Sequence, residues 1–414
     1  MDWKKFGFEY RFDTGGKLFQ HLVNIEAYRE AALNLVLPAE WSEQLDRLNR
    51  IRAVYGTTRL EGNPLSEAEV SNQIEIAEGK KPNDQGRATK EQLQIRNSDI
   101  AQSWTRLRFA PETAPITKED LLKMHEMLTR ESDEKNNVPG RFRTFDVQVG
   151  SEDMGGVHKG APSPMVEKLM DQYFEFLQSK RFNNEHPVIR ALLAHFFLVT
   201  IHPFGDGNGR TARALEALLL QRAGLKDTLF IAMSNYYHEE REKYLDTLAQ
   251  VRAGNCNLTP FLKFGLRGIT QQCGRLYKAI RDEVSKEIFR NLTRELFVRL
   301  ESTRKRVIVR RQLSLLDKLL NIEGAVEFSK MVQIFSDVYK TRKNPVNALI
   351  RDLNRLSYLG AIRITKEEKT PNNPVYYIAV VLDWPTQITE TEFFAKLAHL
   401  PKSKTYGFLS AEET

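Results

Sequence analysis

Apolar residues recur at intervals of three and four along most of the chain, which places them on one face of an α-helix. One such stripe consists of Leu45, Leu48, Ile51 and Tyr55. The helix that carries it is expected to end at Gly62-Asn63-Pro64, because glycine can cap a helix and proline cannot continue one. Residues 80–90 are polar, include Pro82 and Gly86, and predict a loop.

Further helices are predicted at residues 116–130 and 166–178, from Pro187 to a glycine-rich segment, and from about residue 209 to 224. In one short stretch, apolar and polar residues alternate instead. Phe145, Val147 and Val149 are separated by polar residues, and Gly150 ends the run. This pattern predicts a β-hairpin that returns through Gly155-Gly156 and ends near Pro162 and Pro164.

The pattern changes after about residue 305. Helical periodicity at residues 307–320, 328–335 and 345–359 is followed by β-like runs at 361–365 and 375–381. A polar turn with two prolines, at residues 371–374, separates the runs. Three helices and a two-stranded wing are typical of a winged helix-turn-helix domain.

Composition narrows the class of protein. A length of 414 residues favours two or three domains, and 41% hydrophobic with 28% charged residues indicates a globular protein. The net charge of +7 suits ATP or a nucleic acid, but solvated surface lysines explain it equally well. Cys256 and Cys273 form no metal-ligand pattern, and the longest apolar run, at 191–201, is too short to cross a membrane. We therefore expect a cytoplasmic protein without a membrane partner.

The glycine-rich segment at residues 202–213 gathers groups that bind and transfer phosphates. Its sequence is His202-Pro203-Phe204-Gly205-Asp206-Gly207-Asn208-Gly209-Arg210-Thr211-Ala212-Arg213. Alternating glycines predict a positive-φ nest for an anion, and a helix that begins behind them presents its N–H groups to that anion. Arg210 and Arg213 share a helix face, Asp206 offers an oxygen ligand for Mg2+, and His202 can accept a proton. A tight turn between buried helices is the structural alternative.

This segment resembles the HxFx(D/E)GNGRxxR signature of the Fic family, whose characterised members mostly transfer AMP from ATP to Ser, Thr or Tyr hydroxyls of proteins. The resemblance implies that His202 deprotonates the target hydroxyl and that Asp206 holds Mg2+ on the α- and β-phosphates. It also implies that the nucleotide is bound by Gly207, Asn208, Gly209, Arg210, Thr211, Ala212 and Arg213. Tyr244 is expected to flank the adenine, with a buried helical tyrosine as the alternative.

The resemblance also implies functional roles for two other segments. Thr57, Glu61 and Gly62 match the (S/T)xxxE(G/N) inhibitory motif of Fic proteins, which implies that Glu61 pairs with Arg213 and restrains the enzyme. The hairpin residues Val147, Gln148, Val149 and Gly150 resemble the flap that docks the target peptide, with a plain surface hairpin as the alternative.

The predicted fold class is mainly α: a helical Fic core with a short β-hairpin flap, plus a small C-terminal winged helix-turn-helix domain. The predicted boundaries are 1–115 for the N-terminal helical region with the inhibitory helix, 116–269 for the Fic core, 270–302 for a helical linker, 303–390 for the winged helix, and 391–414 for a tail.

The predicted function is a self-inhibited, Mg-dependent protein adenylyltransferase that uses ATP and acts on an unidentified target protein and on itself. A homodimer is an expectation from the resemblance alone. Transfer of another group such as UMP, or removal of AMP, shares the same signature. The basic residues Lys340, Arg342, Lys343, Arg351 and Arg355 allow DNA binding or protein docking by the winged helix. An ATP-sensing DNA-binding regulator is therefore a further alternative.

Overall fold

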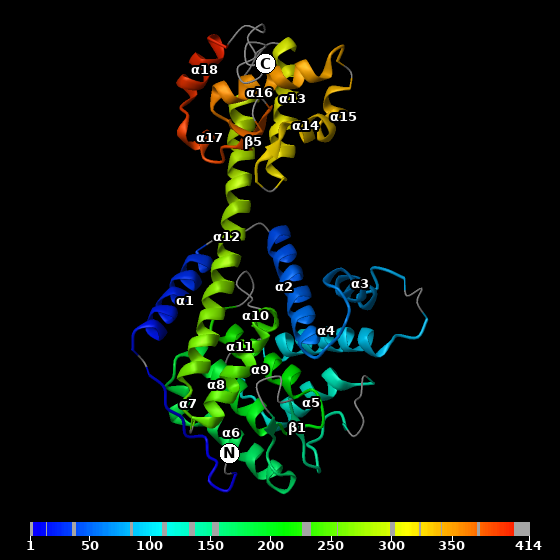
Figure 1. The fold of residues 1–414 in the computed structure, drawn as a ribbon, viewed down its shortest axis with the longest axis vertical. Coiled ribbons are helices and arrows are strands. Elements are labelled where there is room, and N and C mark those ends of the chain that lie inside the picture. The colour runs from blue at the N-terminus through cyan, green and yellow to red at the C-terminus, as the bar shows by residue number, and fades with distance from the viewer. Residues whose placement is uncertain are drawn as a thin grey trace. The chain divides into compact units, whose positions relative to one another are not determined.

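The computed structural model describes residues 3–13, 15–34, 39–82, 86–109, 114–131, 137–150, 157–225, 233–254, 256–298, 303–322, 324–340, 342–370 and 373–400. The chain divides into two compact units, residues 1–277 and 278–414 (Figure 1). The division falls inside one helix, α12 (Thr259–Val298). No described helix combines the length and the apolar character that a membrane span requires.

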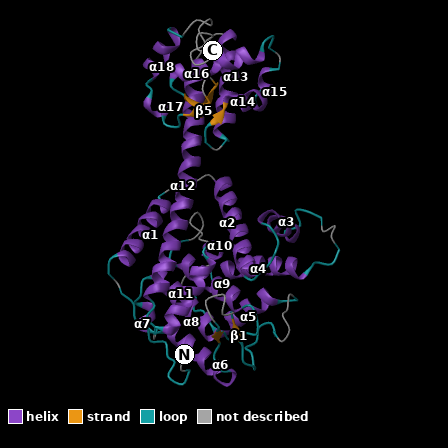
Figure 2. Cartoon of the chain, viewed as in Figure 1, coloured by secondary structure: helices purple, strands orange, loops and turns teal. Residues whose placement is uncertain are grey.

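In its described part, the first unit is almost entirely helical, as predicted, and its strand content is confined to one hairpin (Figure 2). Its elements before α12 are α1 (Lys17–Leu33), α2 (Ala39–Leu60), α3 (Glu67–Ala77), α4 (Lys90–Arg108), α5 (Lys118–Thr129), β1 (Gln148–Val149), β2 (His158–Lys159), the 3-10 turn η2 (Ser163–Met165), α6 (Val166–Gln178), α7 (Lys180–Asn183), α8 (Pro187–Ile201), α9 (Asn208–Arg222), α10 (Met233–Glu239) and α11 (Arg241–Ala253).

Helix α8 is the centre of the first unit's hydrophobic core. Pro187 occupies its first turn, where a missing N–H costs nothing, and the His186 side chain accepts a hydrogen bond from the Val188 N–H. Nearly every later residue of α8 is buried, so the helix is apolar on all sides and is surrounded by others. The glycine-rich segment joins its C-terminus to α9 and therefore starts from a rigid support.

Residues 3–13 are an extended segment that packs on this core, a feature that the periodicity did not predict. Phe8 stacks on Phe176 with ring centroids 5.2 Å apart. The Tyr10 hydroxyl donates to Glu185 at 2.8 Å, and the Arg181 guanidinium lies 4.3 Å from the centre of the Tyr10 ring. The segment itself is not helical. Its aromatic side chains pack on a surface that the helices of the core form.

Helix α2 ends at Leu60 as predicted, and Gly62 follows with a φ of 88°. The predicted apolar stripe is only partly right. Ile51 is buried, but Leu48 is 48% exposed. The buried face instead includes Val54, at 0% exposure, and Thr57, at 4%. The stripe is displaced because Ile51 and Val54 pack against Val70 and Ile74 of α3 and Ile95 of α4, which leaves Leu48 outside this cluster.

Helices α3 and α4 begin with capping boxes, at Ser66 with Glu69 and at Thr89 with Gln92. Such boxes satisfy N–H groups that lack partners inside the helix. The Asn63 amide donates to the Glu91 carbonyl oxygen and to the Gln94 side chain, each at 3.0 Å. The end of α2 is thereby fixed to α4.

The second unit contains the remainder of α12 and the elements predicted for its part of the chain. These are α13 (Thr303–Leu320), β3 (Val326–Glu327), α14 (Phe328–Ile334), α15 (Ser336–Tyr339), α16 (Pro345–Leu359), β4 (Ile362–Thr370), β5 (Asn373–Val380), α17 (Trp384–Gln387) and α18 (Glu390–Ala398). Its sheet is antiparallel, in the order β3-β5-β4, with Ile364 opposite Ile378. The short strand β3 was not predicted. The assignment to the winged-helix class stays a prediction.

Residues beyond 390, predicted as a tail, include α18, whose Phe393 is fully buried in the second unit's core. Its ring lies 5.3 Å from that of Phe297 at the end of α12. The compact unit thus extends on both sides of residues 303–390, because α12 and α18 cover apolar surface that the strands and α16 leave open.

A buried carboxylate holds the second unit's helices together. Asp352 on α16 is 0% exposed and accepts hydrogen bonds from the Nε and Nη2 of Arg311, on α13, with Nη2 at 2.9 Å from Oδ1. The Tyr339 hydroxyl donates to the same carboxylate at 2.9 Å, and the Gln312 amide donates at 3.3 Å. Burial, followed by the nearby Asp352 charge, raises the pKa of Tyr339 above its usual range, so the hydroxyl stays a donor.

We predict that Asp352→Asn lowers the stability of the second unit by about 3–5 kcal/mol, because the buried Arg311 charge loses its counter-ion. Hydrogen exchange of the α16 amides, measured by mass spectrometry, should accelerate accordingly. Asp337→Asn is the matched control. It removes an exposed ion pair with Lys318, worth at most about 1 kcal/mol. Equal exchange in both variants would contradict the prediction.

Candidate active site

The segment between α8 and α9 is a compact turn whose backbone differs in part from the predicted nest. Of its three glycines only Gly207 has a positive φ, 73°, and it is the N-cap of α9. Gly209 is already helical, so the prediction of alternating positive-φ glycines was wrong. The anion-binding character comes instead from the first turn of α9, whose N–H groups lack acceptors inside the helix, and no side chain caps them.

Asn208 fixes the shape of this turn. Its side-chain oxygen accepts from the Phe204 N–H and its amide donates to the Phe204 carbonyl oxygen, both at 2.9 Å. The side chain is 2% exposed, so it faces the turn rather than a ligand. Any contact of Asn208 with a nucleotide would therefore be made by its backbone. Thr211 is similarly occupied, since its hydroxyl donates to the Gly207 carbonyl oxygen at 2.8 Å.

His202 ends α8 in the left-handed conformation, with φ 56° and ψ 59°, which turns its side chain out of the helix. Its Nδ1 lies 3.3 Å from the Val199 carbonyl oxygen. A carbonyl can only accept, so Nδ1 carries the hydrogen and Nε2 is left with a lone pair. Burial lowers the pKa of His202 to about 4, with a further lowering by the Arg143 charge and an opposing effect of Glu61. The imidazole is neutral at pH 7.

Arg143 positions this histidine, and the sequence analysis missed it. Its guanidinium donates to three backbone carbonyl oxygens: those of His202 at 2.7 Å, Phe145 at 2.6 Å and Ala161 at 2.5 Å. Arg143 is 5% exposed, and its own N–H donates to the Pro203 carbonyl oxygen at 3.0 Å. It ties the turn to the hairpin. A lone arginine in a loop gives no sequence signal of such a role.

Asp206, in the turn just before α9, is paired with Arg210 in the first turn of that helix. Arg210 is 2% exposed and also donates to the Leu128 carbonyl oxygen at 3.3 Å. His125 holds Asp206 from α5: its Nδ1 accepts from the Gly140 N–H at 3.0 Å, so Nε2 donates to the Asp206 carbonyl oxygen at 2.9 Å. Burial lowers the pKa of His125 to about 4, which favours this neutral form.

Arg213, the second arginine of the signature, is bound by α2 at two positions one turn apart. Its Nη2 donates to Glu61 Oε1 at 2.6 Å and to the Thr57 carbonyl oxygen at 3.2 Å, and its Nε donates to the Thr57 hydroxyl at 2.9 Å. The Arg213 side chain is 4% exposed, against 31% for Glu61. Thr57 lies in the last turn of α2 and Glu61 directly follows the helix, four residues later, so both contact the same guanidinium.

The Glu61 carboxylate lies over the first turn of α9. A Cβ atom on Gly209 would stand 2.6 Å from Glu61 Oε1 and 2.8 Å from Arg213 Nη1, so the ends of these two side chains would have to shift if residue 209 carried a side chain. Burial by itself would raise the pKa of Glu61, but the charges of Arg213 and Arg210 and the hydrogen bond from Arg213 lower it overall. An ionised carboxylate therefore lies where the helix N-terminus favours an anion.

Tyr244 is on α11 and 5% exposed, with its ring stacked on Tyr237 at 4.6 Å. Its hydroxyl lies 2.8 Å from His195 Nε2, and His195 Nδ1 contacts the buried Glu216. Burial raises the pKa of Tyr244 above its usual range. The buried helical tyrosine, weighed as the alternative, matches this placement. A role beside adenine stays a prediction.

The hairpin is shorter than predicted: Gln148 pairs with Lys159 and Val149 with His158, and the connection at residues 151–156, including Gly155 and Gly156, lies outside the described residues. Both residues of β1 are exposed. A groove of about 790 Å³ runs beside this hairpin and is lined by Trp3, Asp146, Val147, Gln148, Val157, His158, Lys159, Gly160, Pro162, Ala249, Arg252 and Ala253. An exposed strand beside a groove can pair with an extended peptide.

Asp206 fits the role of a magnesium ligand that shares the ion with a nucleotide. One carboxylate oxygen accepts from Arg210, and the other has no partner among the described residues. The side chain is 21% exposed. No group of three or more His, Cys, Asp or Glu side chains with metal-site geometry occurs in the described part of the chain. Mg2+ commonly uses one or two carboxylates and substrate phosphates, so one carboxylate suffices.

The sequence of this part of the chain matches a known family. The model of the Fic/DOC family matches residues 115–220, the segment that contains the turn, His202 and both arginines. Residues 115–220 are therefore similar to a Fic domain. The mainly helical fold predicted for the chain is confirmed by the helices described above. The family match leaves the individual roles of the site residues as predictions.

Curated relatives contain the same domain. The chain is 31% identical over 235 residues to the protein named "Protein adenylyltransferase Fic" of Aedes aegypti, covering 57% of this chain and 43% of the relative. It is 33% identical over 187 residues to the protein of the same name in Drosophila grimshawi, covering 45% and 36%. The chain thus spans less than half the length of these relatives.

Solved structures share the fold. The Fic-1 fragment of C. elegans superposes with a TM-score of 0.52 and 25% identity, over 64% of this chain and 73% of that one. A Fic family protein of Desulfovibrio desulfuricans matches with the same TM-score and 20% identity, over 90% of this chain and 98% of its own. The second likeness shows that the fold extends across nearly the whole chain.

We predict that His202 stays neutral down to about pH 5, because burial lowers its pKa to about 4, from about 6.5 in an unfolded chain. Histidine side-chain NMR measured between pH 4 and 8 tests this, with the His202→Ala spectrum supplying the assignment. A titration midpoint at 6.5 or above would contradict the burial of the imidazole.

Proposed function

We propose that the Fic domain transfers AMP from ATP to a Ser, Thr or Tyr hydroxyl of a protein and is restrained by Glu61. The observation that carries the proposal is the placement of His202, with its Nε2 lone pair free, beside a helix N-terminus whose arginine is held by Glu61. The names of the curated relatives support the same reaction. The transferred group, the target and the restraint are our proposal for this chain.

In the proposed reaction His202 Nε2 accepts the proton of the target hydroxyl as its oxygen attacks the α-phosphorus of ATP. A P–O bond forms, the bond from the α-phosphorus to the bridging oxygen breaks, and pyrophosphate leaves. A hydroxyl ionises far above pH 7, so a positioned base is needed. The hydrogen bond from Nδ1 to Val199 fixes the tautomer, and Arg143 fixes the backbone that carries the ring.

The phosphates would lie at the first turn of α9, where N–H groups and the helix dipole favour negative charge. Arg213 and, as predicted, Arg210 would offset the charge of the outer phosphates. Asp206 would hold Mg2+, which when bound neutralises phosphate charge. Arg210 is paired with Asp206. While this pair is intact, Arg210 would position the Asp206 carboxylate, and a direct contact of Arg210 with a phosphate would require the pair to open.

Glu61 restrains this site through charge and space. Its carboxylate takes the Arg213 Nη2 donor and occupies the surroundings of Gly209, where the γ-phosphate would need to approach. A second anion at this position would meet the ionised Glu61 directly. ATP would therefore be excluded from the productive position until α2 releases Arg213.

We predict that Glu61→Gly labels itself with AMP at least about tenfold faster than wild type, because a charge-assisted hydrogen bond of about 1.5–3 kcal/mol is removed. Intact-mass measurement after incubation with ATP, UTP or GTP supplies the readout. A gain of one AMP, with no gain from UTP or GTP, identifies the transferred group. Glu67→Gly, at an exposed glutamate of α3, is the matched control and should behave as wild type.

The double variant Glu61→Gly/His202→Ala should not be labelled. If wild type and Glu61→Gly label equally fast while the double variant is inactive, the restraint is wrong and the transferase survives. If no nucleotide labels any variant, the transferase proposal itself is wrong.

We also predict that labelling by Glu61→Gly requires Mg2+ and stops when the metal is removed with EDTA. Asp206→Asn in the Glu61→Gly background should raise the Mg2+ concentration for half-maximal labelling by tenfold or more, since a charged ligand is lost. Asp246→Asn, at an exposed position on α11, is the control. An unchanged Mg2+ requirement in the Asp206 variant would assign the metal elsewhere.

The other predicted activities share this site: transfer of UMP, removal of AMP, or ATP sensing without chemistry. The nucleotide comparison above separates them. DNA binding by the second unit, homodimerisation and a cytoplasmic location stay predictions. Lys340, Arg342, Lys343 and Arg351 are exposed, as phosphate contacts or a docking surface would both require.

A further inference from the structure

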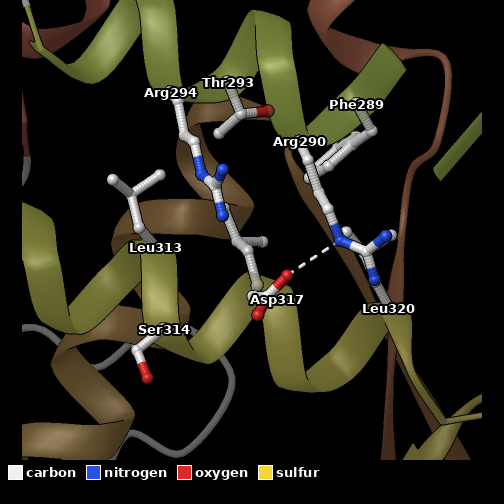
Figure 3. Close-up of a pocket in the computed structure, with 9 residues that line it drawn as sticks. Phe289, Arg290, Thr293, Arg294, Leu313, Ser314, Asp317 and Leu320 are labelled. Carbon is white, nitrogen blue, oxygen red and sulfur yellow. Dashed lines mark hydrogen bonds and ion pairs between the residues drawn. The ribbon is translucent and has the colours of Figure 1, made fainter. Parts of the chain in front are cut away.

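The second unit has a pocket of its own, between the C-terminal part of α12 and α13 (Figure 3). Its volume is about 230 Å³. It is lined by Phe289, Arg290, Thr293, Arg294, Leu313, Ser314, Leu316, Asp317 and Leu320. All of these residues belong to the second compact unit, so the pocket is independent of the Fic site.

Two arginines one helical turn apart project from α12 toward α13, but they differ in their partners (Figure 3). Arg290 Nε donates to Asp317 at 2.8 Å, and its other nitrogens donate to Glu287 at 3.2 Å and Asn321 at 2.7 Å. Arg294 forms no hydrogen bond or ion pair within the part of the chain that the structure describes. The Arg294 side chain is exposed, so its guanidinium is hydrated and can be reached by a ligand in the pocket.

A second group in the pocket wall lacks a partner. Thr293 is 1% exposed, and its hydroxyl has no hydrogen-bond partner among the described residues. A buried polar group without a partner costs about 1–3 kcal/mol and calls for an explanation. Ser314 places a further hydroxyl on the facing helix. The Thr293 hydroxyl is covered by its neighbours, and the Ser314 hydroxyl points away from the two arginines (Figure 3), so Arg294 is the donor that a ligand would meet first.

The remaining wall is apolar. Phe289 and Leu316 are each 1% exposed, and Leu313 and Leu320 complete this side. The volume lies below the range of about 300–1,000 Å³ that is usual for sites of drug-sized ligands. A nucleotide is therefore too large, and the pocket fits a small molecule with an apolar body and a polar end.

The charges select the polar end. Arg290 is paired with both Asp317 and Glu287, so Arg294 is the lining cation that pairs with no carboxylate of the described residues. A carboxylate carries one negative charge and pairs with a guanidinium through two parallel hydrogen bonds. A phosphate group carries about −1.5 to −2 at neutral pH and would bring excess negative charge next to Asp317. We propose that this pocket binds a small organic carboxylate, with Arg294 on the carboxylate and the leucines on the apolar body.

Fluorine NMR of the full chain with 4-fluorobenzoate tests the proposal. We expect saturable binding that weakens by about ten- to a hundredfold in Arg294→Ala, the loss of one charged hydrogen-bonding partner. Ser314→Trp fills the pocket from α13 and should abolish binding. Arg281→Ala, at a 61% exposed arginine on the same helix, is the matched control and should bind as wild type.

Three outcomes would overturn the proposal: no saturable shift at millimolar 4-fluorobenzoate, equal binding of the uncharged 4-fluorobenzamide, or equal binding by Arg294→Ala. Displacement by inorganic phosphate at concentrations below those of 4-fluorobenzoate would reject the carboxylate in favour of phosphate. Circular dichroism of each variant separates lost binding from lost folding. AMP transfer is not needed for this experiment, so its result is independent of the activity of the Fic domain.

Discussion

The guanidinium of Arg213 must have an anion, and the site is organised around that need. A side chain that is 4% exposed cannot leave its charge to water, so its counter-charge has to come from the protein or from a ligand. Glu61 and Thr57 supply the partners from α2. In the proposed function a nucleotide phosphate would meet the same donors, so inhibition and activity would be alternative ways of satisfying one buried cation.

A buried arginine is used differently in the second unit. Arg311 and Asp352 also form a buried pair, but the Tyr339 hydroxyl and the Gln312 amide satisfy the same carboxylate. Its partners all come from helices of one compact unit. No described group competes for Arg311, so this pair fixes a structure and has no second state. The pair of Glu61 and Arg213 differs from it in exposure. The Glu61 side chain is 31% exposed, so solvent or a ligand can reach one side of this pair.

Local patterns predicted the elements well and their contacts less well. Helix α8 begins at Pro187, and α2 ends just before Gly62, as predicted. These ends were predictable because proline and glycine affect a helix within one turn of their position. Leu48 was expected in the core and is exposed, because the direction of a buried face depends on what packs against it. Strand β3 was missed because two residues give no period, and it exists only because β5 offers an edge.

The sequence by itself identified the groups of the candidate site: His202, the carboxylates and the arginines lie close together in the chain or match a family signature. Only the tertiary structure decided how they are held. Asn208 and Thr211 face the turn instead of a ligand, and Arg143 reaches His202 across 59 residues of chain. The physical reason is that composition and short-range spacing fix which groups are available, whereas burial and hydrogen-bond partners depend on segments that only folding brings together.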